Sequence, residues 1–149
     1  MKINILNSKE TKKIKMYLKE QYGFSGKLDY IFLLSSKDKI YLISRDFERI
    51  DTEKLNIDTL GLYFATKMPE LRISIEGSQI IGPYCKKGIV DIDAINARKW
   101  LSGEDVPIES KETGFLLVRH GKDFMGSGKV KDGTLLNFVP KTRRLYASK

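Results

Sequence analysis

The chain has 149 residues, of which 41% are hydrophobic and 31% are charged, and its formal net charge is +8 at pH 7. This balance is typical of a globular protein and excludes a largely disordered chain. No apolar run approaches the roughly 18 residues of a membrane span. The apolar stretch at the N-terminus is also too short for a secretory signal. The single cysteine, Cys85, excludes an internal disulfide and predicts a reducing, cytoplasmic location.

Positive charge is concentrated at the two ends of the chain. Residues 1–50 hold 11 basic and 6 acidic side chains, residues 51–118 hold 8 and 11, and residues 119–149 hold 8 and 2. A basic segment within a folded domain attracts phosphate, although a lysine-rich surface also serves solubility. The charge pattern alone therefore leaves two interpretations open, a nucleic-acid partner and solubility.

The first half predicts one helix followed by strands. Asn7 and Glu10 have the spacing of a capping box, and apolar residues then recur at helical spacing as far as Gly23. The lysines of this helix form a stripe that faces either solvent, the simpler interpretation, or RNA: Lys9, Lys12, Lys13, Lys15 and Lys19. Residues 30–34 and 40–43 read as a hairpin, residues 61–65 as a buried strand and residues 73–81 as a short helix.

The break at Met68-Pro69-Glu70 predicts a domain boundary. We expect an α+β domain at residues 1–70 and a second domain at residues 71–149. The second begins with a strand at residues 88–90 and a helix that Asp91 or Asp93 caps, ending near Gly103. Trp100 in that helix could stack on a base, but a core position is the better expectation.

Three further strands follow at residues 115–118, 124–130 and 134–139, joined by turn-forming residues, and they predict a meander or a small barrel. The segment "GSGKVKDGTLLNFVPKTRR" covers the last two of them and continues to Arg144. It lacks the spacing of a nucleotide-binding P-loop. Glycine in a strand marks a bulge or a close approach of another backbone, so a phosphate could meet Lys129 there. Pro140 would present the basic residues Lys141, Arg143 and Arg144, and arginine suits phosphate and guanine.

This segment resembles the PUA-type domain that ends the Sun-type RNA cytosine methyltransferases. Upstream, "SIEGSQIIG" and "DIDAINARKWLSGEDV" resemble the entry to the same domain in archaeal relatives, so that the likeness covers residues 72–145. The layout also resembles small PUA-containing ribosome-biogenesis factors. The resemblance implies an N-terminal α/β domain of pre-PUA type before a PUA-like pseudo-barrel that recognises structured RNA.

The resemblance implies no methylation, because the cofactor loop and catalytic cysteine motifs have no place in this sequence. Cys85 is expected to be a bystander thiol, and one histidine, His120, is poor evidence for a metal site. Asp91, Asp93, Glu104 and Asp105 could form a paired-carboxylate site, but capping explains the first two simply. We therefore expect no catalytic residue, no metal and no cofactor.

The leading hypothesis is an accessory factor that binds rRNA or tRNA in modification, processing or ribosome assembly. Its expected RNA contacts are Lys129, Asn137, Lys141, Arg143 and Arg144, with Lys86 and Lys87 as a second basic patch. One alternative is an adaptor that docks an RNA-modifying enzyme or a ribosome-assembly protein. A small unrecognised enzyme is the remaining one, and no membrane partner is expected.

Overall fold

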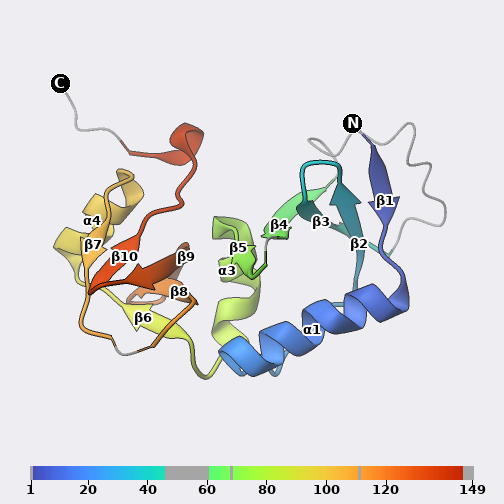
Figure 1. Ribbon diagram of the computed structural model, residues 1–149, viewed down its shortest axis with the longest axis horizontal. Coiled ribbons are helices and arrows are strands. Elements are labelled where there is room, and N and C mark those ends of the chain that lie inside the picture. The colour runs from blue at the N-terminus through green and yellow to red at the C-terminus, as the bar shows by residue number, and fades with distance from the viewer. Residues whose placement is uncertain (1, 46–60, 68, 111, 146–149) are drawn as a thin grey trace.

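The computed structural model describes residues 2–45, 61–67, 69–110 and 112–145, and within them the chain forms two five-stranded sheets with helices packed against them (Figure 1). The expected α+β class is confirmed. No helix in the described part of the chain is long and apolar enough to cross a membrane. Residues 46–60, for which the sequence pattern is ambiguous, lie outside the described residues.

The first sheet is antiparallel throughout and its strands follow chain order. They are β1 (Ile3–Ile5), β2 (Tyr30–Ser35), β3 (Lys39–Ser44), β4 (Leu62–Lys67) and β5 (Leu71–Ile73). Helix α1 (Ser8–Tyr22) packs on this sheet through Ile14, Leu18 and Tyr22, which share a core with Phe32 and other strand residues. Both hydrogen bonds of the predicted capping box are present, and Gly23 ends the helix in the left-handed conformation.

The second sheet has the order β6-β8-β9-β10-β7. Its strands are β6 (Ile89–Asp91), β7 (Val106–Pro107), β8 (Phe115–His120), β9 (Asp123–Lys131) and β10 (Thr134–Leu136), and only the β6–β8 pair is parallel. Helix α4 (Ala94–Leu101) packs beside it and is capped by Asp93, one of the two caps considered. Strands β8, β9 and β10 pair antiparallel in chain order, which is the meander of the two expected alternatives. Because the described pairing leaves β6 and β7 at the edges, the sheet is not a closed barrel.

The strand expected over residues 134–139 ends early, at Leu136. The next side chain, Asn137, donates from Nδ2 to the carbonyl oxygens of Trp100 and Glu104, at 2.8 and 2.9 Å. Its Oδ1 accepts from the backbone N–H of Val139 at 2.7 Å. These three bonds turn the chain away from the sheet and fix the segment that follows.

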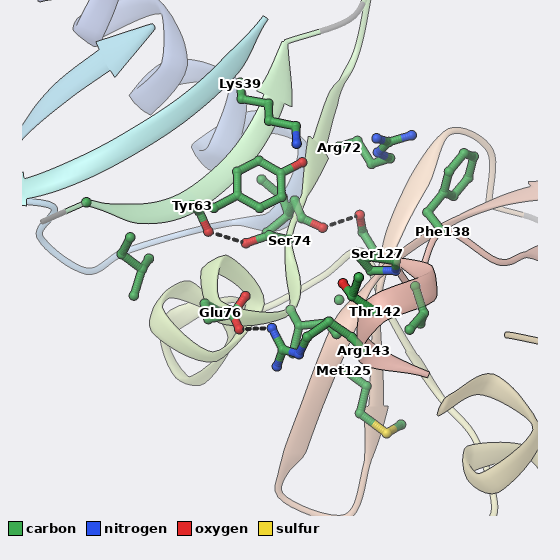
Figure 2. Close-up of a pocket in the computed structure, with 17 residues that line it drawn as sticks. Lys39, Tyr63, Arg72, Ser74, Glu76, Met125, Ser127, Phe138, Thr142 and Arg143 are labelled. Atoms are coloured by element: carbon green, nitrogen blue, oxygen red, sulfur yellow. Dashed lines mark hydrogen bonds and ion pairs between the residues drawn. The ribbon is translucent and has the colours of Figure 1, made fainter. Parts of the chain in front are cut away.

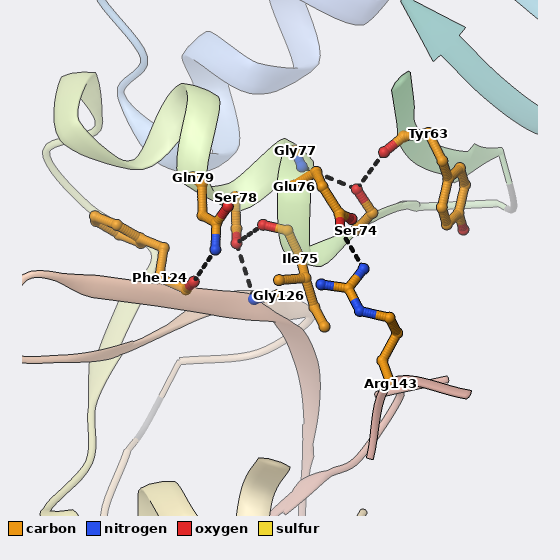
Figure 3. A network of polar contacts seen from close by, with 10 residues as sticks. All are labelled: Tyr63, Ser74, Ile75, Glu76, Gly77, Ser78, Gln79, Phe124, Gly126 and Arg143. Atoms are coloured by element: carbon orange, nitrogen blue, oxygen red, sulfur yellow. Dashed lines mark hydrogen bonds and ion pairs between the residues drawn. The ribbon is translucent and has the colours of Figure 1, made fainter. Parts of the chain in front are cut away.

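Helix α3 (Ile75–Ile81) is wedged between the two sheets (Figure 3). Its N-cap, Ser74, donates to the carbonyl of Tyr63 in β4 at 2.6 Å, while the N–H of Gly126 in β9 donates to Ser78 Oγ at 2.8 Å. A Cβ on Gly77 would lie 2.3 Å from the carbonyl oxygen of Phe64, so the helix approaches β4 as closely as glycine permits. The helix thus holds the two sheets in one arrangement.

Residues of both sheets share one core cluster, in which Leu117 and Phe124 of the second sheet join the buried residues of the first. The first sheet also continues to Ile73 through β5, beyond the Met68-Pro69-Glu70 break. The division into domains at residue 70 stays a prediction. What the structure gives is two sheets packed against each other around α3.

Candidate nucleic-acid interface

The glycines of β9 make room for protein atoms. Gly126 has φ +93° and faces Ile75 of α3, and a Cβ on Gly128 would lie 2.6 Å from the Trp100 ring. Trp100 is fully buried and donates from Nε1 to the carbonyl of Met125 at 2.8 Å, so its core position is confirmed. The bare main chain that sequence reasoning offered to a phosphate is therefore covered by the chain itself.

Two of the expected RNA contacts already have partners in the chain. The Lys129 Nζ lies 3.5 Å from Glu70 Oε1 and 5.8 Å from the centre of the Phe115 ring. Both Nδ2 hydrogens of Asn137 are used in the turn after β10. Lys129 remains half exposed, at 46% of its side chain, whereas Asn137 has the geometry of a structural residue.

The basic segment after Pro140 is exposed. Lys141–Arg143 form a short 3-10 helix with no buried residue. Arg143 pairs with Glu76 of α3, and Arg144 donates from Nε to the carbonyl of Val139 at 3.1 Å. The segment is thus held at defined points, and the Lys141 and Arg143 residues in it are exposed.

Lys86 and Lys87 lie elsewhere. Their backbone N–H groups donate to the carbonyl of Tyr22, at the C-terminal end of α1. In Figure 1 the segment before β6 lies at the bottom of the view beside this helix end, whereas the segment after β10 rises at the top. The two predicted basic patches therefore do not merge into one surface.

A cleft of about 490 Å³ opens between the two sheets, and we call it the inter-sheet cleft (Figure 2). Residues of β3, β4, β5, α3, β9 and the C-terminal segment line it. Its charged and aromatic lining residues are Lys39, Tyr63, Arg72, Glu76, Phe138 and Arg143.

Of the residues expected from the sequence, Arg143 lines this cleft, and Lys129 lies beside it, next to a pair of tilted aromatic rings. The Phe115 and Phe138 rings are 5.3 Å apart, with Lys129 over the first and the Arg72 guanidinium 4.9 Å from the centre of the second. Cations on aromatic faces are the arrangement that nucleic-acid sites use to combine charge with stacking.

Four residues that line the cleft were not among the contacts expected from the sequence: Lys39, Tyr63, Arg72 and Phe138. Arg72 had a usable signal, because it lies between Leu71 and Ile73, which are both buried, in the alternation of a strand. The segment was instead expected to lead into a helix. Lys39 and Tyr63 carried no local signal, since they join the cleft only when the first sheet packs beside α3.

The two side chains considered for nucleophilic or metal chemistry, Cys85 and His120, form hydrogen bonds with backbone carbonyl groups. Burial raises the pKa of the Cys85 thiol to about 11, and the thiol donates to the carbonyl of Ile81. His120 Nδ1 lies 2.8 Å from the carbonyl oxygen of Ile92 and so carries the proton of that bond.

Three of the four carboxylates considered for a paired site bind other groups of the chain. Asp91 binds Arg119 through both oxygens, at 2.6 and 2.9 Å, and these bonds lower the pKa of its carboxyl. Asp93 caps α4, and Asp105 accepts from the N–H of Asn137 at 2.7 Å. Among the described residues, no three Cys, His, Asp or Glu side chains gather as a metal site would require.

Comparison with known proteins supports the expected domain. Residues 87–145 match the family model described as the methyltransferase RsmF PUA domain, so a PUA domain is present in the chain. Two bacterial enzymes named ribosomal RNA small subunit methyltransferase F, from Aeromonas salmonicida and Aeromonas hydrophila, are each 29% identical to the chain over 111 residues.

Those 111 residues are 73% of this chain but 23% of each enzyme, so the chain spans about a quarter of the length of the relatives it matches. The expected likeness to PUA domains of RNA methyltransferases is confirmed. These relatives are bacterial, and the archaeal character expected from the sequence finds no support in them.

Proposed function

We propose that this chain, whose residues 87–145 form a PUA domain of the RsmF methyltransferase type, binds structured RNA and performs no catalysis itself. Ribosomal RNA is the first ligand to consider, because the similar enzymes are named for it. The second is tRNA. The chain would act as an accessory factor in RNA modification, in RNA processing or in ribosome assembly.

One observation carries the proposal. The PUA domain ends in an exposed basic segment that is held beside the inter-sheet cleft by Arg143–Glu76 and by Arg144–Val139. Lysine and arginine on an exposed, positioned segment favour phosphate binding. The side chains of Cys85, His120 and Asp91 are each hydrogen-bonded within the chain, which supports the non-catalytic part of the proposal.

The test compares RNA binding of the wild type with that of Lys129→Ala/Lys141→Ala/Arg143→Ala at two salt concentrations. The probes are a small-subunit rRNA fragment and a tRNA. Because phosphate contacts dominate, we expect wild-type affinity to fall steeply with salt and the variant to bind about tenfold more weakly with a shallower salt dependence. A charge-matched control, Lys37→Ala/Arg98→Ala/Lys122→Ala, removes three exposed cations that belong to neither the C-terminal segment nor the lysine stripe of α1, and it should bind almost as well as wild type.

Wild-type affinity that does not change with salt would contradict the proposal. So would an equal loss in both triple variants, because the charge would then act through its total amount and not through the C-terminal segment. A separate Lys86→Ala/Lys87→Ala variant decides whether the patch at the end of α1 adds a second contact.

A further inference from the structure

The inter-sheet cleft contains two cations that have no carboxylate partner within the described part of the chain. Of its three basic residues, only Arg143 forms an ion pair, with Glu76, which is also the sole carboxylate in the lining. Lys39 and Arg72 are each held over an aromatic ring instead, at 5.4 Å from the Tyr63 centre and 4.9 Å from the Phe138 centre. Two half-buried cations without a counter-ion form a site at which a bound anion would gain a large favourable electrostatic energy.

The cleft offers a base-binding wall as well as charge. Tyr63 and Phe138 contribute ring surface, and Ile73, Ile75 and Val139 contribute apolar surface around them. Figure 2 shows Tyr63 below Lys39, with Arg72 and Phe138 on the opposite side of the opening. A phosphate beside a planar, partly apolar wall is the chemistry of a nucleotide.

The volume of the cleft fits an unpaired nucleotide better than a duplex. About 490 Å³ lies within the usual range of about 300–1,000 Å³ for small-ligand pockets, and it suits one or two nucleotides. A paired base is stacked inside its helix and offers only groove edges, so its face is not available to such a wall. The cleft is also preformed, because Ser74 and Ser78 tie α3 to the strands on either side.

We propose that the inter-sheet cleft receives an unpaired segment of the bound RNA, with phosphate held by Lys39 and Arg72 and a base placed against Tyr63 and Phe138. This inference rests on the proposed RNA-binding function and makes it more specific. Lys39, Tyr63 and Arg72 lie outside the matched PUA residues 87–145, so the first sheet supplies half of the site. The PUA domain alone would then lack the preference for unpaired RNA.

The experiment uses two fluorescent RNAs that share one stem, of which one carries an unpaired extension of several nucleotides and the other is blunt. Fluorescence anisotropy gives the affinity of the full chain for each at one salt concentration. We expect wild type to prefer the extended RNA about tenfold, which corresponds to stacking of one base. Arg72→Gln and Lys39→Gln should remove most of this preference, while the exposed controls Arg98→Gln and Lys37→Gln keep it within twofold.

The glutamine variants keep much of the side-chain packing, and a circular dichroism melt shows whether each is folded. Phe138→Leu is the second probe, because it retains apolar volume while losing the ring, and it should reduce the preference without removing the charge. Equal wild-type affinity for the two RNAs would overturn the inference and leave the proposed function intact. Binding of neither RNA would overturn both, and an equal effect of cleft and control variants would overturn the inference alone.

Discussion

The glycine strand β9 and the basic segment 140–144 belong to one sequence motif, yet the structure uses them in opposite ways. Residues 124–128 are all buried, with Gly128 against Trp100, whereas Lys141–Arg143 have no buried member. The glycines could have left main chain open for a phosphate beside Lys129, but they make room for Ile75 of α3 and Trp100 of α4 instead. The difference teaches that the first half of the motif is scaffold, and the proposed RNA binding is therefore assigned to the second half and to the cleft beside it.

Replacing Trp100 should lower the free energy of unfolding more than any other change to the buried half of the motif. The ring is fully buried and its N–H is bonded to Met125, so Trp100→Ala leaves both a cavity and an unpaired carbonyl. We expect a loss of about 3–5 kcal/mol in the free energy of unfolding, measured by urea denaturation. Ile95→Ala on the same helix removes a side chain that is 71% exposed and should cost no more than about 0.5 kcal/mol. Similar losses for the two variants would contradict the described core.

Gly128→Ala tests the glycine directly. Its Cβ would meet the Trp100 ring at 2.6 Å and the backbone oxygen of Leu136 at 2.8 Å, so we expect a loss of about 1–3 kcal/mol. Gly121→Ala is the matched control, because its Cβ meets nothing within 4 Å and only its left-handed φ of +61° costs energy, about 1 kcal/mol. If Gly128→Ala folds as stably as the control but loses RNA affinity, β9 is a contact surface and the comparison fails.

Asn137→Ala sharpens the boundary between the two halves. The change removes three hydrogen bonds that fix the segment after β10, and we expect a loss of about 1–2 kcal/mol in unfolding free energy. RNA affinity, measured on folded protein at low temperature, should change less than for Arg72→Gln. A large affinity loss without a stability loss would return Asn137 to the list of RNA contacts.

The smallest effect is expected at Asp91, on the edge strand β6. Its carboxyl pKa is lowered mainly by the hydrogen bonds from Arg119, so the pair stabilises the fold above the unfolded pKa of about 3.9, and this contribution is lost as pH falls through the lowered folded value. Because the Asp91 side chain is 62% exposed, Asp91→Asn should cost only about 0.2–1 kcal/mol at pH 7. The difference from wild type should vanish near pH 2, and an equal difference at both pH values would show that charge is not its cause.

Local patterns predicted much of the fold. The Asn7–Glu10 capping box, the hairpin of β2 and β3, and the strands β8 and β9 are where periodicity and turn residues placed them. The strand β5 was missed although Leu71, Arg72 and Ile73 alternate as in a strand, because the segment is short and runs directly into the helix that was expected there. The choice between a meander and a barrel was left open because strand count does not determine closure.

The candidate site was less predictable for a physical reason. Arg143 could be named from the sequence, since a proline and basic cluster is a local feature. The cleft depends on α3 fitting between two sheets, which requires glycine at position 77 and hydroxyls at 74 and 78. Such contacts join residues far apart in the chain, so a local sequence pattern cannot predict them.

The most direct test of the account is the map of backbone amide shifts when the 17.1 kDa protein, labelled with ¹⁵N, is titrated with the extended RNA. The account predicts that the largest changes surround the inter-sheet cleft, at Lys39, Arg72, Phe138 and Arg143. Changes confined to Lys86, Lys87 and the lysine face of α1, with the cleft residues unmoved, would contradict it.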